Sequence, residues 1–292
     1  PIPRANMPTL GDYHKKTTPI THMPESVNWW QNRPKYMNSY LKAYFGKKAT
    51  KENDFGYAWL GKGDVVKSER DGDYSMLYAY EKMAKGEMKG GSIWAHNPCQ
   101  SIPNSTNVRK ALTTLDFLYA AEIHHNETTD FWRGPGINPK EVKTEVFLFP
   151  SCHRLEKEGS ISSSQRMIGW HYKAAEPKGD SKSMGQIMIE IMNRVIKLYK
   201  KEGGTFPEPI VNLNWYDEYD AEEIAKRING WFTGGPGKGK QLSGFGDFKD
   251  DGTTACLNWL YAGSFTEDGN RMKRTGLEQT DLQKRAGIYP NY

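Results

Sequence analysis

Long apolar runs and closely spaced cysteines are both absent from this sequence. No stretch approaches the roughly 18 apolar residues that a membrane-spanning helix needs, and hydrophobic residues make up 37% of the 292 positions. The three cysteines, Cys99, Cys152 and Cys256, lie far apart and form no CxxC or CxxxC pair. Because iron–sulfur and zinc sites need closely spaced ligands, this chain alone carries no such ligand set. Their odd number argues against a disulfide framework, so we expect buried free thiols.

A concentrated basic face is also missing. The chain has 40 basic and 35 acidic residues, which interleave and leave a net charge of +5. Nucleic-acid binding proteins gather their positive charge on one face, so we expect no nucleic-acid partner. No Gly-x-Ser-x-Gly elbow and no recognisable Cys–His frame is present, which argues against a self-sufficient catalyst. The chain begins with Pro1 and shows no signal peptide, and both ends look internal, so we expect a processed, split or partial polypeptide.

Helical and strand patterns alternate between residues 25 and 150 and predict an α/β fold. The order of helix, strand, helix, strand, strand is typical of an open, Rossmann-like sheet layer. The predicted elements are helices over 35–45, 50–60 and 74–85 (capped by Asp73), a strand over 92–95, a helix over 108–112 capped by Asn104, and strands over 117–121 and 145–149.

Beyond residue 150 the pattern predicts a mixed α+β, loop-rich region. An apolar stripe over 184–199 predicts the best helix of the chain, and we interpret the stripe as core packing. Asp220 caps another short helix, and the glycine-rich stretch 233–246 reads as a surface loop. We therefore divide the chain into an extended connector over 1–24, an α/β dinucleotide-binding domain over 25–150, and a mixed region over 151–292.

The most informative segment runs from Trp94 to Thr129. It predicts a strand, an Asn97-Pro98 turn, a helix, a second strand and a polar loop after that strand. Open α/β sheets bind nucleotides at the carboxyl ends of their strands. The turn and the Glu, Thr and Asn side chains after the second strand therefore predict a surface that reads a base and a ribose.

Other polar motifs favour plain structural roles. The loop 234–240 lacks the spacing and the following Ser or Thr of a P-loop, so we interpret it as a solvated loop. His124 and His125 are adjacent on a strand and would point to opposite faces, which argues against one metal site. The stretch 158–166 offers glycine, hydroxyls and an arginine that suit a phosphate or pyran-ring cofactor, although a polar turn explains it as well. The stretch 250–254 is a turn that lacks the ligand pattern of a calcium loop.

Taken together, these segments resemble the large subunits of molybdenum- or tungsten-containing bis-pyranopterin oxidoreductases, and most of all respiratory formate dehydrogenase α subunits. The resemblance covers nearly the whole chain but only the central part of such a subunit. It rests on six stretches, at 27–35, 47–53, 96–104, 144–151, 158–171 and 250–270.

The resemblance implies that the chain binds one molybdopterin guanine dinucleotide (MGD) of a bis-MGD centre holding molybdenum or tungsten. Ala95 stands where the family usually has glycine, and Glu122 stands where it usually has aspartate. The implied cofactor-binding residues are Asn97, Pro98 and Ser101 near ribose or phosphate, Glu122 near the guanine with Asn126, Glu127 and Thr128 beside it, and Gly159, Ser160 and Arg166 near the pterin.

The implied reaction is the oxidation of formate to carbon dioxide, or its reverse, in anaerobic respiration. The family's four-cysteine cluster motif, its metal-ligating residue and its catalytic arginine have no counterpart here, so we assign no catalytic residue. The implied partners are the remaining segments of the catalytic subunit, an iron–sulfur electron-transfer subunit and a membrane anchor subunit, and iron–sulfur clusters are expected only in those segments. The family also implies a periplasmic location.

Two alternatives stay open. The first is a family member in a respiratory complex that has no formate activity. The second is a stand-alone binding or scaffold protein, such as a carbohydrate binder, suggested by 9 Trp and 16 Tyr. Tyr36, Tyr40 and Tyr44 fall on an apolar helix face, which argues against exposed sugar platforms.

Overall fold

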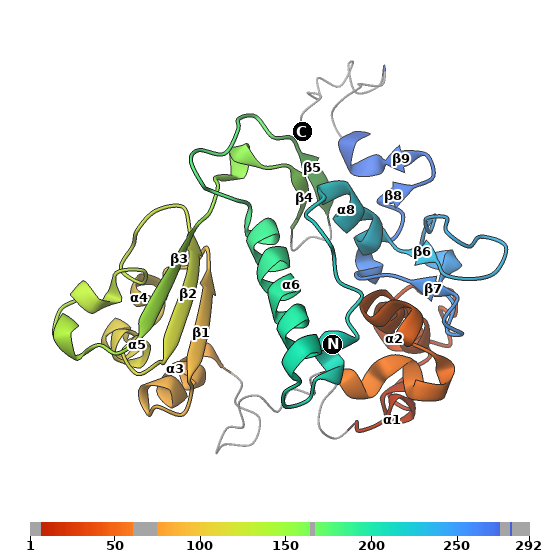
Figure 1. Cartoon of the computed structure of the whole chain (residues 1–292). Coiled ribbons are helices and arrows are strands. Elements are labelled where there is room, and N and C mark those ends of the chain that lie inside the picture. The colour runs from red at the N-terminus through yellow and green to blue at the C-terminus, as the bar shows by residue number, and fades with distance from the viewer. Residues whose placement is uncertain (1–6, 61–74, 164–166, 275–280, 282–292) are drawn as a thin grey trace. The chain divides into compact units, whose positions relative to one another are not determined.

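The chain forms two compact units, seen in a computed structural model that describes residues 7–60, 75–163, 167–274 and 281 (Figure 1). Each unit has its own core, and α6 (Met184–Glu202) includes the junction at residues 188 and 189. Unit 1 comprises Pro1–Gly63, Glu158–Tyr172 and Ile189–Tyr292, and unit 2 comprises Asp64–Lys157 and Lys173–Met188.

Unit 2 is built on a parallel three-stranded sheet in the order β1-β2-β3. The helices α3, α4 and α5 gather on one side of this sheet (Figure 1). The predicted α/β fold is therefore confirmed. The elements are α3 (Met76–Ala84), β1 (Gly90–Trp94), α4 (Pro98–Ser101), α5 (Ser105–Leu112), β2 (Phe117–Glu122), β3 (Glu145–Pro150) and the short 3-10 helices η4 (Phe131–Arg133), η5 (Pro139–Glu141) and η6 (Arg154–Glu156).

One face of the sheet carries the core of unit 2. Side chains alternate across a strand, and Ile93, Leu118 and Ala120 all point to the face that the helices cover. Asn104 caps α5 as predicted, because its side-chain oxygen accepts a hydrogen bond from the Asn107 N–H at 3.2 Å. The cap holds in place the buried residues that α5 adds to this core, which are Val108, Ala111 and Leu112.

The opposite face of the sheet is aromatic. The alternate positions of the three strands carry Trp94, Phe117, Tyr119, Phe147 and Phe149. Trp94 and Phe149 both meet Tyr119 edge-on, with ring centroids 5.7 and 6.4 Å apart. Phe117 is 41% exposed and Phe147 is 44% exposed. We call these five residues the aromatic face.

Unit 1 is organised around α2 (Trp29–Phe45). Asn28 caps this helix by accepting a hydrogen bond from the Gln31 N–H at 2.9 Å. The helix therefore begins six residues earlier than the predicted start at Lys35. Pro34 does not begin it but follows a kink at Asn32, where the backbone leaves the helical region (φ −103°).

Several short elements complete unit 1 around α2. The helix α8 is capped by Asp220, as predicted. The short strands pair as antiparallel hairpins, β4 with β5, β6 with β7 and β8 with β9. The elements are α1 (Leu10–His14), η1 (Gly46–Lys48), η2 (Lys51–Trp59), β4 (Gly159–Ser162), β5 (Ile168–His171), α7 (Glu208–Val211), α8 (Ala221–Asn229), β6 (Trp231–Phe232), η7 (Phe245–Asp247), β7 (Thr254–Ala255), η8 (Trp259–Tyr261), β8 (Phe265–Thr266), β9 (Gly269–Asn270) and η9 (Arg271–Arg274).

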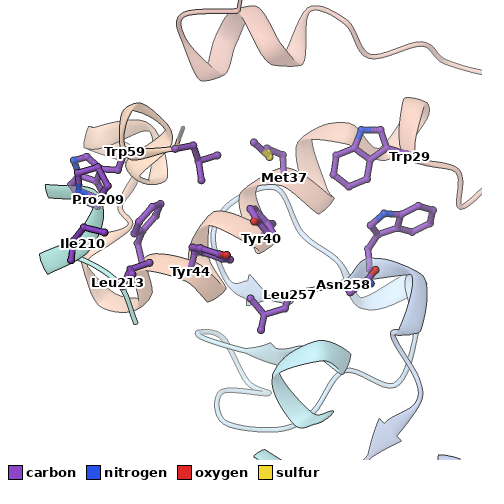
Figure 2. Close-up of a pocket in the computed structure, with 13 residues that line it drawn as sticks. Trp29, Met37, Tyr40, Tyr44, Trp59, Pro209, Ile210, Leu213, Leu257 and Asn258 are labelled. Atoms are coloured by element: carbon purple, nitrogen blue, oxygen red, sulfur yellow. The ribbon is translucent and has the colours of Figure 1, made fainter. Parts of the chain in front are cut away.

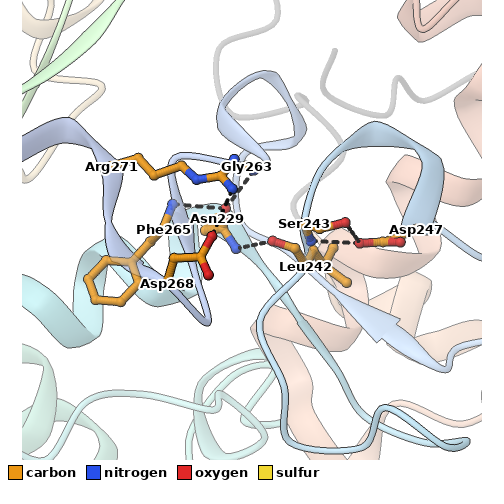
Figure 3. Close-up of polar contacts among 8 residues, drawn as sticks. All are labelled: Asn229, Leu242, Ser243, Asp247, Gly263, Phe265, Asp268 and Arg271. Atoms are coloured by element: carbon orange, nitrogen blue, oxygen red, sulfur yellow. Dashed lines mark hydrogen bonds and ion pairs between the residues drawn. The ribbon is translucent and has the colours of Figure 1, made fainter. Parts of the chain in front are cut away.

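Asn229, the last residue of α8, is the polar centre of this unit (Figure 3). Its side chain is fully buried. Its Nδ2 donates to the carbonyls of Gly230 and Leu242 at 2.9 and 3.0 Å. Its Oδ1 accepts from the N–H groups of Gly263 and Phe265 at 2.6 and 3.1 Å. One side chain thus joins α8 to two loops that are remote in sequence.

Besides the start of α2, the structure differs from the predicted elements in three places. The stretch 158–166, which a polar turn also explained, contains β4, since Ser160 pairs with Trp170 across the hairpin. Within the expected connector, a capping box between Thr9 and Asp12 supports α1. Over 50–60 the helix is a 3-10 helix interrupted by left-handed residues such as Asp54.

The predicted helix α6 is present, but its stripe is only partly core. Ile187 is 5% exposed, whereas Met188 is 44% exposed and Leu198 is 52% exposed. The interpretation of the whole stripe as core packing was therefore wrong. Asp73 lies outside the described residues. The functional division into a connector, a cofactor domain and a mixed region stays a prediction.

The three cysteines are free and buried, as expected. Within the described ranges, no helix is long and apolar enough to cross a membrane.

Candidate functional site

The residues predicted to read a nucleotide meet in unit 2, where β1 and β2 end. The backbone N–H of Ala95 still donates to the Ala121 carbonyl at 3.1 Å, and the chain then turns away from the sheet. Ala95 has a φ of +48°, a left-handed conformation that glycine adopts without steric cost. Alanine therefore retains a glycine-like turn here, which leads directly into α4 with Pro98 at its first position.

Glu122 ends β2 and folds back onto this turn. Its Oε1 accepts a hydrogen bond from the backbone N–H of His96 at 2.7 Å. Within the part of the chain that the structure describes, its Oε2 has no hydrogen bond from the protein. One carboxylate oxygen thus fixes the turn, and the other can accept from a ligand.

Asn97 links the loop after β1 to the loop after β2. Its Oδ1 accepts from the Thr128 hydroxyl at 2.7 Å, and its Nδ2 donates to Glu127 Oε2 at 2.5 Å and to Gln100 Oε1 at 3.4 Å. The Thr128 hydroxyl in turn accepts from the Cys99 N–H at 3.0 Å. The Asn97 amide is therefore occupied by the protein itself.

Asn126 and Ser101 also hold their loops in shape. The Asn126 Oδ1 accepts from the N–H groups of Thr128 and Thr129 at 3.0 and 3.1 Å, which forms an Asx turn. The Ser101 hydroxyl donates to the Asn97 carbonyl at 2.9 Å and lies 2.8 Å from His96 Nε2. These residues position the site, whereas the acids at its edge remain open to a ligand.

Glu127 lies at the rim of the site. The hydrogen bond from Asn97 lowers the pKa of Glu127 below its ordinary range, so this carboxylate is ionised at neutral pH. A cavity of about 460 Å³ opens beside it. Its lining residues are Arg109, His125, Asn126, Glu127, Asp130, Arg133, Gly134 and Pro135.

Two arginines, neither of them predicted from the sequence, line this cavity. Arg109 comes from α5 and donates to the Ser105 hydroxyl at 3.3 Å. Arg133 lies with its guanidinium carbon 6.0 Å from the centre of the Trp132 ring. A Cβ on Gly134 would lie 2.8 Å from Arg109 Cδ, so glycine leaves room for that side chain. Only the fold brings the two arginines together, and no sequence motif marks them.

The other predicted residues lie elsewhere. Gly159 and Ser160 belong to unit 1, in the first strand of the β4–β5 hairpin. Arg166 lies outside the described residues. In the turn over 250–254, Asp251 accepts from the backbone N–H and the hydroxyl of Thr253, which satisfies it within the protein. No group of three or more His, Cys, Asp or Glu side chains in the described ranges could hold a metal ion.

Unit 1 has a separate apolar cavity of about 590 Å³ beside α2 (Figure 2). Tyr40 and Tyr44 line one part of it, with ring centroids 4.9 Å apart. Trp29 and Trp259 line another part, with ring centroids 5.9 Å apart. Burial raises the pKa of the Tyr40 hydroxyl. These rings pack mainly against one another, so the cavity offers few polar groups to a ligand.

No family model matches the chain, but individual relatives do. The chain is 46% identical over 299 residues to formate dehydrogenase 2 subunit alpha (cytochrome c-553) of Nitratidesulfovibrio vulgaris, which covers 100% of the chain and 29% of the relative. It is 40% identical over 302 residues to the formate dehydrogenase subunit alpha of Megalodesulfovibrio gigas, and the match covers 99% of the chain and 29% of the relative. The formate dehydrogenase-O major subunit of Escherichia coli K12 is 36% identical over 291 residues, and the match covers 94% of the chain and 28% of the relative.

The chain spans less than a third of the length of these relatives. The similarity covers nearly the whole chain, as the resemblance in its motifs predicted. The chain therefore belongs to the family of formate dehydrogenase alpha and major subunits and corresponds to one segment of such a subunit.

Proposed function

We propose that this chain is part of the catalytic subunit of a molybdenum- or tungsten-dependent formate dehydrogenase, and that unit 2 binds the guanosine end of one MGD. The observation that carries the proposal is the convergence of Glu122 and the Asn97–Glu127 pair at the carboxyl ends of β1 and β2, with an arginine-lined cavity beside Glu127. Ligands of open α/β sheets bind at this edge. The proposed reaction is the two-electron oxidation of formate to carbon dioxide, or its reverse.

The side chains present fit the chemistry of the group. Guanine carries adjacent N–H donors, which a carboxylate accepts in a charge-assisted pair. Among the residues that the structure describes, none donates a hydrogen bond to the second oxygen of Glu122. Phosphate oxygens are acceptors that guanidinium groups bind well, and Arg109 and Arg133 line the neighbouring cavity. Its volume of about 460 Å³ falls within the usual range of ligand sites.

The remaining predicted residues divide into two roles. We propose that Asn97, Ser101, Asn126 and Thr128 position the two loops, because their polar atoms are bonded within the protein. Glu127, which is ionised and exposed, would accept from the base or the ribose beside Glu122.

Gly159, Ser160 and Arg166 are proposed to lie near the pterin, on the strength of the family resemblance alone. The bound cofactor would supply the metal at which the two electrons are transferred. The share of this chain is to bind and orient that cofactor.

The test is to replace Glu122 in the full-length subunit. Glu122→Ala and Glu122→Gln remove the acceptor charge, and Glu81→Gln, an exposed position on α3, is the matched control. Guanine nucleotide released by acid hydrolysis and bound molybdenum or tungsten are measured per subunit. Full cofactor content in both Glu122 variants would overturn the assignment, whereas a loss confined to them supports it.

The alternative of a family member without formate activity is settled by a second assay. Preparations with full metal and nucleotide content are tested for formate oxidation with an artificial electron acceptor. Turnover supports the dehydrogenase, and no turnover at full cofactor content supports the alternative.

We further propose the partners and the location that the family implies. The relatives are named alpha or major subunits, which points to further subunits. We propose an iron–sulfur electron-transfer subunit and a membrane anchor subunit as these partners, and the periplasm as the location. Co-purification with the tagged subunit and fractionation of cells test both.

A further inference from the structure

Asn229 and Gly230 form the only Asn-Gly pair in the sequence. An asparagine followed by glycine is the pair most prone to deamidation, because glycine has no Cβ to hinder attack by its own backbone nitrogen. Here the pair lies at the end of α8, and the Asn229 side chain is fully buried between loops that are remote in sequence (Figure 3). The most reactive kind of asparagine thus lies at the polar centre of unit 1.

Deamidation begins when the backbone nitrogen of Gly230 attacks Cγ of Asn229. A bond forms between that nitrogen and Cγ, the Cγ–Nδ2 bond breaks, and ammonia leaves a closed succinimide ring. Water then opens the ring at one of its two carbonyl carbons. Attack at Cγ gives aspartate, and attack at the main-chain carbonyl carbon gives isoaspartate. Water is the co-reactant, and nothing is oxidised or reduced.

The folded structure withholds both reacting groups. The Gly230 N–H donates to the Lys226 carbonyl at 2.9 Å, which engages the nucleophile. The Asn229 amide is fixed by hydrogen bonds to two carbonyls and from two N–H groups, at 2.6 to 3.1 Å. Reaction requires the amide carbon to turn onto the Gly230 nitrogen, so these hydrogen bonds must first break. The reactive state is therefore one in which this part of unit 1 has opened.

The products do not fit the folded site. In aspartate, an oxygen replaces Nδ2 and faces the carbonyls of Gly230 and Leu242, to which it cannot donate. A buried carboxylate without a paired charge is costly. In isoaspartate, the main chain is one carbon longer directly before Gly230. There is no room for it, since even a Cβ on Gly230 would lie 2.6 Å from the Ala255 carbonyl oxygen. Neither product can restore the arrangement in Figure 3.

We propose that Asn229-Gly230 is a deamidation site that is closed while unit 1 is folded and opens when it unfolds, and that its reaction keeps unit 1 from folding again. Unfolding of this unit is then reversible only for as long as the Asn229 amide survives. The proposal rests on contacts within unit 1 and does not depend on the cofactor assignment.

The chain offers a matched control at the end of α6. Glu202 is the last residue of that helix, and Gly203 follows it with a φ of +72°, as Gly230 follows α8 with a φ of +99°. The Gly203 N–H donates to the Tyr199 carbonyl at 3.0 Å, which repeats the hydrogen bond at the end of α8. The Glu202 side chain is 60% exposed. Glu202→Asn therefore places a second Asn-Gly pair in the same helix-end geometry, without the buried hydrogen bonds of Asn229.

Deamidation is followed in the full-length Glu202→Asn subunit by mass spectrometry of its peptides, in native buffer and in guanidinium chloride. In native buffer we expect position 229 to react at least about tenfold more slowly than position 202, because its hydrogen bonds must open first. In denaturant the two positions should react at similar rates. Equal native rates at the two positions, or an unreactive position 229 in denaturant, would overturn the proposal.

The consequence for folding is tested with Asn229→Asp, which introduces one product directly, and with Glu202→Asp as its control. We expect hydrogen exchange of the amides near 242 and 263–265 to be at least about tenfold faster in Asn229→Asp, and unchanged in the control. Failure of Asn229→Asp alone to accumulate as folded subunit supports the same conclusion. Exchange and yield equal to those of the unmodified subunit would overturn it. Both readouts work without bound cofactor, so this proposal and the Glu122 test can fail independently.

Discussion

Replacing Asn229 should have the largest effect of any single polar substitution in unit 1. Asn229→Ala leaves the N–H groups of Gly263 and Phe265 and the Leu242 carbonyl without the partner they have in the structure. The Gly230 carbonyl is less affected, because it also accepts from the Leu242 N–H at 2.8 Å. A buried polar group left unpaired costs about 1 to 3 kcal/mol. Three groups at roughly 1 to 1.5 kcal/mol each give a loss of about 3 to 4.5 kcal/mol in the local free energy of unfolding.

Hydrogen exchange in the full-length subunit measures this loss, with Asn193→Ala as the control. Asn193 is also a helical asparagine, but it is half-buried, and among the described residues its side chain makes a single hydrogen bond, to the Asp217 carbonyl at 2.9 Å. A loss of about 3 kcal/mol corresponds to exchange more than about 100-fold faster for amides near 242 and 263–265. The control should change exchange by less than about tenfold. Equal effects of the two substitutions would show that the four-bond arrangement in Figure 3 does not hold these loops.

Three further predictions concern individual backbone and charge features. Ala95→Gly relieves a left-handed alanine, so the free energy of unfolding should stay constant or rise by up to about 1 kcal/mol. The midpoint of thermal unfolding is the readout, and a clear fall would contradict the turn geometry. Gly230→Ala should destabilise the loop, because φ is +99° and a Cβ would lie 2.6 Å from the Ala255 carbonyl oxygen; faster proteolysis near residue 230 is the readout, and unchanged proteolysis would count against it. Because the pKa of Glu127 is lowered in the folded protein, its hydrogen bond with Asn97 contributes to stability above the ordinary pKa of glutamate. This contribution to stability is lost as pH falls through the pKa of Glu127 in the folded protein. Under the proposed function, retention of the guanine nucleotide should fall in acid, because a protonated Glu127 loses its charge as an acceptor. Glu127→Gln should remove that component of the pH dependence, and an unchanged profile would exclude this carboxylate.

Local signals made much of unit 2 predictable. The strands at 117–121 and 145–149 and the cap at Asn104 depend on neighbouring residues, and the structure has them nearly where expected. The clustering of Asn97, Glu122 and Glu127 also followed from sequence, because parallel strands bring their carboxyl ends to one edge. The residues that follow the carboxyl end of a strand are a local property, which the sequence shows directly.

The features that could not be predicted depend on contacts between distant residues. Ser160 enters a strand only because Trp170 pairs with it, and the surrounding serines favour a turn when read alone. Arg109 and Arg133 meet across a cavity that exists only in the folded chain. The early start of α2 required the Asn28 cap to outweigh Pro34 inside the helix, and single-residue propensities do not reveal that balance.

The hydrogen bonds that Asn97 makes with Thr128 and Glu127 have a consequence for when a cofactor could enter the subunit. They join the two loops within this chain, so the entropy lost on ordering those loops is already lost when unit 2 folds. A ligand that enters later meets a pre-organised wall, and its binding energy is not spent on arranging the loops. Under the proposed function, cofactor insertion can therefore follow folding of this unit, and a cofactor-free subunit should keep this part of the proposed binding surface intact.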